Sequence, residues 1–247
     1  MDSLSVARSM RGSIGMLAME WLMAPSTLQK AETRGMPAGR ASYAVGRLGV
    51  LGDTPVDNVV GAAFFWYPDL MRKMVIDGRA GISPTGGAKI YAAISQEWGE
   101  DKLADFDGTI RLGELLQSVV SQASPLGAPI FVGWRDQELP APGPGRTFQL
   151  AQTMRELRFS RHTVAVQASG MGPLEAILTG PAGEWNAEMF GWPKPYPGIE
   201  QLEAQREAIE AATDQLHAVD LDVLTDDERA ELRQLAKEAR AHVSTQS

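Results

Sequence analysis

Prolines and glycines divide this chain into short segments, and most of the segments have the periodicity of an α-helix. In the first of them apolar residues recur at the i, i+3, i+4 and i+7 positions of one helical face: Ile14, Leu17, Ala18 and Trp21. Pro25 ends this segment, and Ser26 is a suitable N-cap for a second helix over residues 27–34. Gly35 can end that helix. The expected framework is therefore a set of short helices joined by tight turns.

The same start and stop signals predict helices through the rest of the chain. The predicted ranges are 37–51, 56–67, 68–76, 89–103, 109–123, 148–157, 161–168, 173–178, 200–217 and 226–242. Residues 78–87 are rich in glycine and are expected to form a loop, and residues 130–132 are expected to form one short strand. Thr225 and Glu228 have the spacing of a capping box at the start of the last helix.

One segment marks a division of the chain. Residues 139–145 (LPAPGPG) hold three prolines and two glycines, a composition that cannot sustain a strand ladder or a helix interior. We therefore predict an N-terminal helical domain over residues 1–138, a linker at 139–145, a second domain over 146–198 and an acidic helical tail over 199–247.

Charge and cysteine content restrict the functions open to the chain. It has no cysteine, which excludes disulfides and thiolate metal sites, and no metal site or cofactor is predicted. No apolar run is long enough to span a membrane, and we predict a cytoplasmic location. The net charge is −8, but residues 1–47 hold six Lys/Arg against three acids, whereas residues 199–247 hold five against 12. A polyanion would be repelled by the tail and accepted by the N-terminal part.

The strongest candidate for nucleic-acid contact is the N-terminal helix-turn-helix pattern. Ala31 allows two helices to approach, and Gly35 permits the positive φ of the turn between them. The predicted DNA contacts are Lys30, Arg34, Arg40, Ser42, Tyr43 and Arg47. Three of them share a helical face, since Arg40, Tyr43 and Arg47 lie at i, i+3 and i+7. The alternative is a solvated basic face with Tyr43 half-buried.

A second helix-turn-helix pattern covers residues 161–178. Its second helix, residues 173–178, offers only Glu175 as a polar side chain, and a carboxylate repels phosphate. We interpret this unit as a packing module.

Two groups are candidates for a ligand site. Phe64, Phe65, Trp66 and Tyr67 are consecutive, and no single helical face can bury all four, so they line a pocket or belong to a helix buried on all sides. Arg155, Arg158 and His162 share a helical side and are either an anion site or partners of the acidic stretches. No catalytic motif is recognisable, and no catalytic residue is predicted.

Several segments together resemble the actinobacterial SalHTH-type helix-turn-helix family. They are Tyr43-Ala-Val-Gly-Arg47, Ala62-Ala-Phe-Phe-Trp-Tyr-Pro68, Arg155-Glu-Leu-Arg158 through Ala176, and Glu210-Ala-Ala-Thr-Asp214. The resemblance covers roughly residues 14–216 and implies a mainly α-helical fold with a winged-helix-like C-terminal half and a regulator-like function. The chain departs from the family pattern at Leu157, where a histidine is common, and at residues 159–161, where a Gly/Asp-rich turn is expected.

Pattern and resemblance together predict a regulator-like protein with tandem winged-helix-like halves and a helical C-terminal tail. Double-stranded DNA and a small-molecule effector are its expected partners, and the tail is expected to serve homodimerisation, which is an argument from analogy. The alternative is a ligand-binding or protein-interaction module that has kept the scaffold and lost DNA binding. A third reading, an enzyme using Arg155, Arg158 and His162, has less support.

Overall fold

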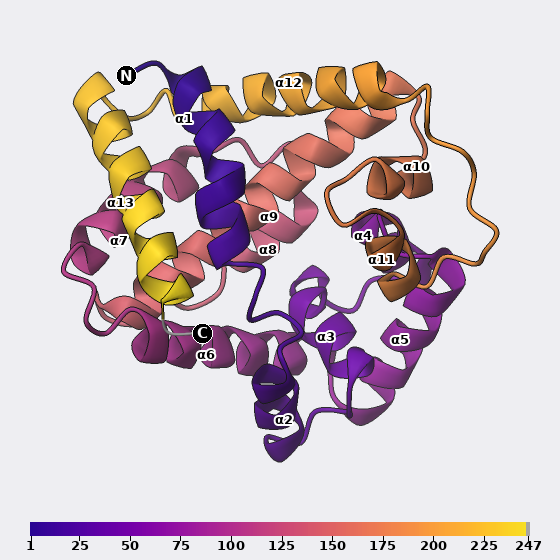
Figure 1. The fold of residues 1–247 in the computed structure, drawn as a ribbon. Helices are drawn as coiled ribbons and strands as arrows, with labels where there is room; N and C mark the ends of the chain where they lie inside the picture. The colour runs from indigo at the N-terminus through magenta and orange to yellow at the C-terminus, as the bar shows by residue number, and fades with distance from the viewer. Residues whose placement is uncertain (246–247) are drawn as a thin grey trace.

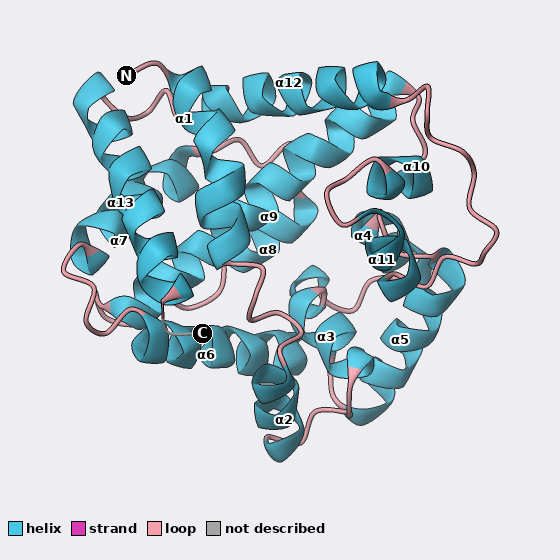
Figure 2. Ribbon diagram, viewed as in Figure 1, coloured by secondary structure: helices cyan, strands magenta, loops and turns pink. Residues whose placement is uncertain are grey.

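The protein is all-helical in residues 1–245, the part of the chain that the computed structural model describes. These residues contain no β-strand, so the mainly α prediction is confirmed, while the wings of a winged helix are not seen among them (Figure 2). The α-helices are α1 (Ser3–Met10), α2 (Pro25–Thr33), α3 (Arg40–Arg47), α4 (Val56–Ala63), α5 (Pro68–Gly81), α6 (Pro84–Lys102), α7 (Thr109–Gln122), α8 (Pro129–Arg135), α9 (Pro144–Ser169), α10 (Pro173–Leu178), α11 (Gly183–Met189), α12 (Glu203–Asp220) and α13 (Asp226–Ser244), with a π-helical turn η1 (Arg11–Gly15) and a 3₁₀ turn η2 (Gly49–Leu51).

Helix α9 is the centre of the fold. It runs diagonally through the molecule and contacts α6, α7, α8 and α12 (Figure 1). We predicted two helices here, at 148–157 and 161–168, but nothing in residues 158–160 breaks a helix, and the Ser160 hydroxyl donates to the carbonyl of Glu156 one turn back at 3.0 Å. The helix begins inside the predicted linker, because Pro144 occupies a first-turn position, which needs no N–H donor.

The opening segment is less regular than predicted. Its apolar side chains Ile14, Leu17 and Trp21 are buried as expected, but α1 ends at Met10 and passes into the π-helical turn η1, followed by turns over residues 18–23. The third predicted helix, residues 37–51, is shortened to α3 plus η2. Gly39 precedes α3 with a φ of +62°, a conformation that holds residues 37–39 outside the helix.

Two glycines allow α3 to pack closely against α5 and α6. A Cβ at Gly46 of α3 would lie 2.4 Å from Cγ of Tyr91 on α6, and a Cβ at Gly78 of α5 would lie 2.9 Å from the carbonyl oxygen of Ala41. The glycine-rich stretch 78–87, predicted as a loop, is therefore mostly helical. Its glycines serve helix packing, and only residues 82–83 separate α5 from α6.

Two other predictions are wrong in this region. The helix predicted over 56–67 ends at Ala63, because Phe64 adopts a positive φ of 46° that an α-helix cannot continue. The predicted strand 130–132 lies instead in α8, which opens with Pro129 and buries Ile130, Phe131 and Trp134. A run of three apolar residues carries no period that separates strand from helix.

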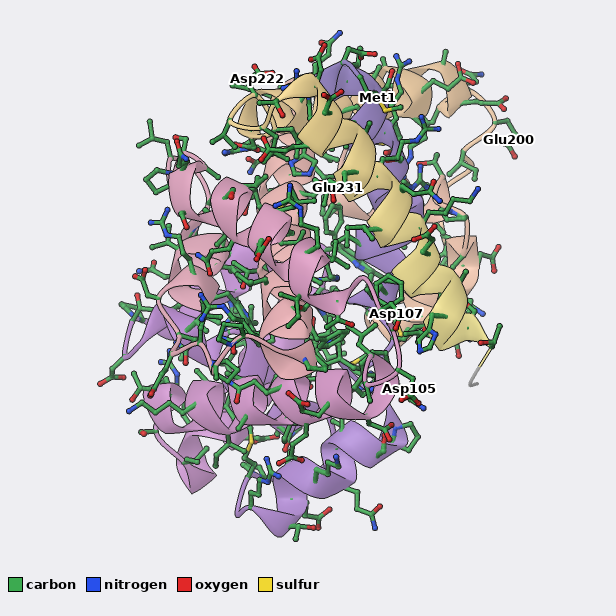
Figure 3. All side chains as sticks on the ribbon, turned by 90° about the vertical axis from the view of Figure 1, so that its left-hand side faces the viewer. Met1, Asp105, Asp107, Glu200, Asp222 and Glu231 are labelled. Carbon is green, nitrogen blue, oxygen red and sulfur yellow. The ribbon has the colours of Figure 1, made fainter. Side chains whose placement is uncertain are left out.

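The C-terminal helices pack onto the same body as the N-terminus. Helix α13 contacts α1 and α7, and its predicted capping box is confirmed by bonds in both directions between Thr225 and Glu228. Met1 and Asp222 lie at the same end of the molecule (Figure 3). The division into domains stays a prediction, but the contacts of α9 with α6 and α7 cross its boundary. In the described part of the chain no helix combines the length and apolarity needed to cross a bilayer.

Candidate functional site

The N-terminal helix-turn-helix unit consists of α2 and α3. Its turn closes where predicted: Gly35 has a φ of +82°, and the amide of Met36 donates to the carbonyl of Ala31 at 3.0 Å. Ala31 itself is fully buried at the approach of the two helices. The unit therefore has the geometry that its small residues suggested.

The face of α3 that was predicted to read DNA points into the protein. Ser42, Tyr43 and Arg47 are only 0%, 4% and 2% exposed. The Ser42 hydroxyl donates to the carbonyl of Pro37, and the remaining two side chains belong to a buried network. These three residues are therefore not available to DNA in this structure, and the alternative of a solvated basic face with Tyr43 half-buried does not describe them either.

The buried network centres on an ion pair between α3 and α9. Arg47 donates from Nε and Nη2 to the two carboxylate oxygens of Glu156, at 2.8 and 2.7 Å, and from Nη1 to the hydroxyl of Tyr43 at 2.8 Å. Gln152 and Arg155 donate to the same carboxylate. Burial alone would raise the pKa of Glu156, but the charges of Arg47 and Arg155 and the hydrogen bonds from Arg47 and Gln152 together outweigh it, and the pKa is lowered. Both partners are therefore charged.

The basic residues of the unit that do reach the surface are Lys30, Arg34 and Arg40. Lys30 pairs with Glu97 of α6 at 3.2 Å, and Arg34 pairs with the same carboxylate. Arg40 makes no ion pair with any residue in the described part of the chain. Three cations stand against two carboxylates, those of Glu97 and of the exposed Glu32 on α2, so this surface keeps a positive excess of one charge.

Comparison with known proteins agrees with this architecture. Residues 7–196, about three quarters of the chain, match a helix-turn-helix family. The chain belongs to that family. No curated protein and no solved structure gives a significant match to it.

In this helix-turn-helix protein the four consecutive aromatic residues serve packing. Phe65 lies 5.7 Å, ring centre to ring centre, from both Phe159 and His162. The backbone carbonyl of Phe65 accepts the indole N–H of Trp192 at 2.8 Å. The other rings pair in the same way: Phe64 with Phe65, Trp66 with Tyr43 and Phe190, and Tyr67 with Trp192. The segment thus fastens the α10–α11 region to α3 and α9.

The predicted cluster of Arg155, Arg158 and His162 is split by the fold. Arg155 joins the buried network, with Nη1 2.9 Å from Glu156. Arg158 faces α12 instead and pairs with Glu210 and Asp214, each at 3.2 Å. These contacts are the ion pairs with the acidic stretch that the sequence offered as the alternative to an anion site.

His162 lies beside Arg158 on the side of α9 that faces α12. Its Nδ1 is 2.9 Å from the hydroxyl of Thr213. Burial lowers the pKa of His162 to about 4, although Glu210 opposes the shift. The imidazole is therefore neutral at physiological pH and acts as a packing and hydrogen-bonding group.

The second helix-turn-helix unit, α9 to α10, presents no reading surface. Helix α10 has the predicted range, and Ala176, Ile177 and Leu178 are buried in it. The packing-module interpretation therefore fits its burial. Over residues 1–245 no group of three or more His, Asp or Glu side chains is arranged to hold a metal ion.

The sequence analysis did not identify the residues that pair with Arg47 of α3 and with Arg158 of α9. Glu156 was not predicted to take part in a site, and neither were Arg11, Arg206 and Glu210. Local spacing offered a few signals, such as the i, i+4 pairs Gln152–Glu156 and Arg206–Glu210, but this spacing is common on helices. The ion pairs between different helices join residues from 52 to 199 positions apart, and no local pattern encodes them.

Proposed function

We propose that this protein is a DNA-binding regulator whose phosphate contacts come from Lys30, Arg34 and Arg40. The observation that carries the proposal is the family match over residues 7–196, which includes the α2–α3 unit that holds these three exposed cations. Phosphate contacts from Lys and Arg supply most of the affinity of such proteins. Within the family we place the chain in the actinobacterial SalHTH-type branch, and we propose a cytoplasmic location.

The test is fluorescence anisotropy with labelled genomic DNA fragments at two salt concentrations. Affinity is expected to fall with salt, by a logarithmic slope of about 0.9 per phosphate contacted. The triple variant Lys30→Gln/Arg34→Gln/Arg40→Gln is expected to lose affinity and to reduce that slope. A matched variant, Lys194→Gln/Lys237→Gln, removes two exposed cations outside the unit and should behave as the wild type.

A variant at Glu97 tests the same proposal in the opposite direction, because it should raise the affinity for DNA. Glu97→Gln removes the carboxylate that Lys30 and Arg34 share, so it is expected to tighten DNA binding at low salt. If the wild type binds no fragment at low salt, or if neither variant changes the affinity, the proposal is wrong.

The burial of the α3 face favours a second candidate function. With Ser42, Tyr43 and Arg47 inside the protein, only Arg40 of the predicted α3 contacts remains exposed to read base edges. A ligand-binding or protein-interaction module that has lost DNA binding would have this arrangement. It predicts that the anisotropy experiment gives no binding at any salt concentration.

We also propose a homodimer formed through an apolar patch of α9, α12 and the loop between α7 and α8. The patch comprises Leu126, Val164, Leu216 and Val219, which are 79%, 41%, 38% and 69% exposed. Arg161 of α9 ties its parts together, because it pairs with Asp220 of α12 at 2.7 Å and donates to the carbonyl of Leu126 at 3.2 Å.

A second copy is the partner that suits this patch. The chain carries a net charge of −8, so two copies can approach most readily at a surface without excess charge. The four side chains of the patch are uncharged, and Arg161 and Asp220, which lie next to it, neutralise each other. An apolar patch of this kind marks an interaction site.

A further inference from the structure

A groove between α1 and α12 is lined by three arginines and three carboxylates, and Arg158, which pairs with two of these carboxylates, gives the cluster one arginine in excess. The groove has a volume of about 500 Å³. Arg8 and Arg11 line it from the N-terminal side, Arg206, Glu207, Glu210 and Asp214 line it from α12, and Thr179 and Pro181 close one end. The volume is in the range of sites for small organic molecules.

Glu210 lies among three guanidinium groups. Its Oε2 is 3.4 Å from Nη1 of Arg11 and 3.2 Å from Nη2 of Arg158, and its other oxygen accepts from Arg206. Burial would raise the pKa of Glu210, but the neighbouring His162 and the charges of these three arginines together keep it below its usual value. One carboxylate therefore pairs with three arginines, and Asp214 forms a further ion pair with Arg158.

Two further features leave capacity for another anion. The Nε of Arg158 is buried and has no hydrogen-bond partner among the described residues. Arg8 is exposed at the mouth of the groove and forms no ion pair in the described part of the chain. Counting Arg158 beneath the groove, four arginines face the carboxylates of Glu207, Glu210 and Asp214.

We propose that this groove binds a small oxyanion, either a carboxylate or a phosphate group, through the guanidinium groups of Arg8 and Arg11. Guanidinium presents paired N–H donors in a planar fork that matches both groups. The proposal rests on the regulator function proposed above, and it gives the small-molecule effector expected from the sequence a site and a chemical class. It places the ligand away from the aromatic segment, where the sequence had suggested a pocket.

The test measures ligand binding to the full chain without DNA, so its result is independent of the DNA-binding proposal. Isothermal titration uses inorganic phosphate in one arm and citrate in the other, each against sodium chloride of equal ionic strength. Thermal unfolding under the same conditions gives a second readout, because a ligand that binds the folded state raises the melting temperature. Binding of phosphate alone identifies a phosphate site, and binding of citrate alone identifies a carboxylate site.

Arg8→Gln is the diagnostic variant, because Arg8 takes part in no ion pair whose loss would disturb the fold. It is expected to weaken oxyanion binding about tenfold or more, the usual effect of losing a charge-assisted hydrogen bond. Arg11→Gln should act in the same direction. Lys89→Gln, an exposed cation on α6, is the matched control and should bind as the wild type. Equal binding by the wild type and Arg8→Gln, or no binding beyond that in chloride, would overturn the proposal.

Discussion

Arg47 on α3 and Glu156 on α9 form a two-pronged ion pair in the protein core, with N–O distances of 2.8 and 2.7 Å. Both side chains are almost fully excluded from solvent, at 2% and 0% exposure. The guanidinium also lies over the ring of Phe159, 4.8 Å from its centre. This pair joins the N-terminal helix-turn-helix unit to the central helix.

The first prediction concerns this pair. Glu156→Gln should lower the free energy of unfolding by about 3–5 kcal/mol, because it leaves the Arg47 guanidinium buried without an opposite charge. Urea unfolding followed by circular dichroism measures the change. Asp57→Asn, which removes an exposed partner of Arg72, is the control and should change stability little.

A double-mutant cycle separates the pair from its surroundings. Arg47→Met and Glu156→Gln remove the same interaction, so their combined cost should fall short of the sum by about 1–3 kcal/mol. Strictly additive losses would mean that the two side chains do not depend on each other.

The second prediction concerns the contact between α3 and α6. Gly46→Ala should destabilise the protein by about 1–3 kcal/mol, since the added methyl group meets the ring of Tyr91 at 2.4 Å and that ring is fully buried. Gly61→Ala in α4 is the matched control. It has open space around it, and it should stabilise its helix by up to about 1 kcal/mol. Thermal melts of the two variants should therefore shift in opposite directions.

The third prediction concerns pH. The pKa of His162 is lowered to about 4 in the folded state and is near 6.5 when unfolded. Below pH 6.5 His162 therefore binds a proton in the unfolded chain but stays neutral in the folded protein. The stabilising contribution of neutral His162 is present above pH 6.5 and is lost as the pH falls to about 4, with a total of about 3 kcal/mol.

His162→Gln should flatten the stability curve in that window. Urea midpoints between pH 7 and pH 4.5 measure it. His217 is also buried and has a lowered pKa, so His217→Gln is measured in parallel. The pH dependence of stability that remains in each variant gives the contribution of the other histidine. If His162→Gln leaves the slope unchanged, His162 is not held neutral in the folded protein.

The fourth prediction concerns self-association. Val219→Glu places a charge in the middle of the apolar patch and should convert the proposed dimer to a monomer in sedimentation equilibrium. Ile76→Glu makes the same change at an exposed position of α5, where Ile76 is 53% exposed, and should leave the dimer intact. A wild-type protein that sediments as a monomer at all accessible concentrations would contradict the dimer.

Local signals in the sequence were sufficient wherever backbone chemistry decides the outcome. Thr225 and Glu228 cap α13 as predicted, Gly35 closes the turn after α2, and α10 has its predicted range. Caps, positive φ angles and proline positions depend on a few neighbouring residues, so a short stretch of sequence contains all the information they need.

Local signals failed where packing overrode them. Glycines 78 and 81 indicated a loop, but they lie in α5, and Gly78 allows α3 to approach it. Residues 158–160 were expected to separate two helices, but they continue α9 because neighbouring helices cover it on several sides. Burial against distant segments can outweigh local propensity by several kilocalories per mole.

The sequence by itself determined that this chain is helical and that it carries a helix-turn-helix unit with basic residues. Only the tertiary structure decided which of those residues face solvent. Helical periodicity places Arg40, Tyr43 and Arg47 on one side of α3, but it does not say whether that side meets water or Glu156. That outcome depends on a carboxylate 109 residues away, whose charge makes burial of an arginine tolerable.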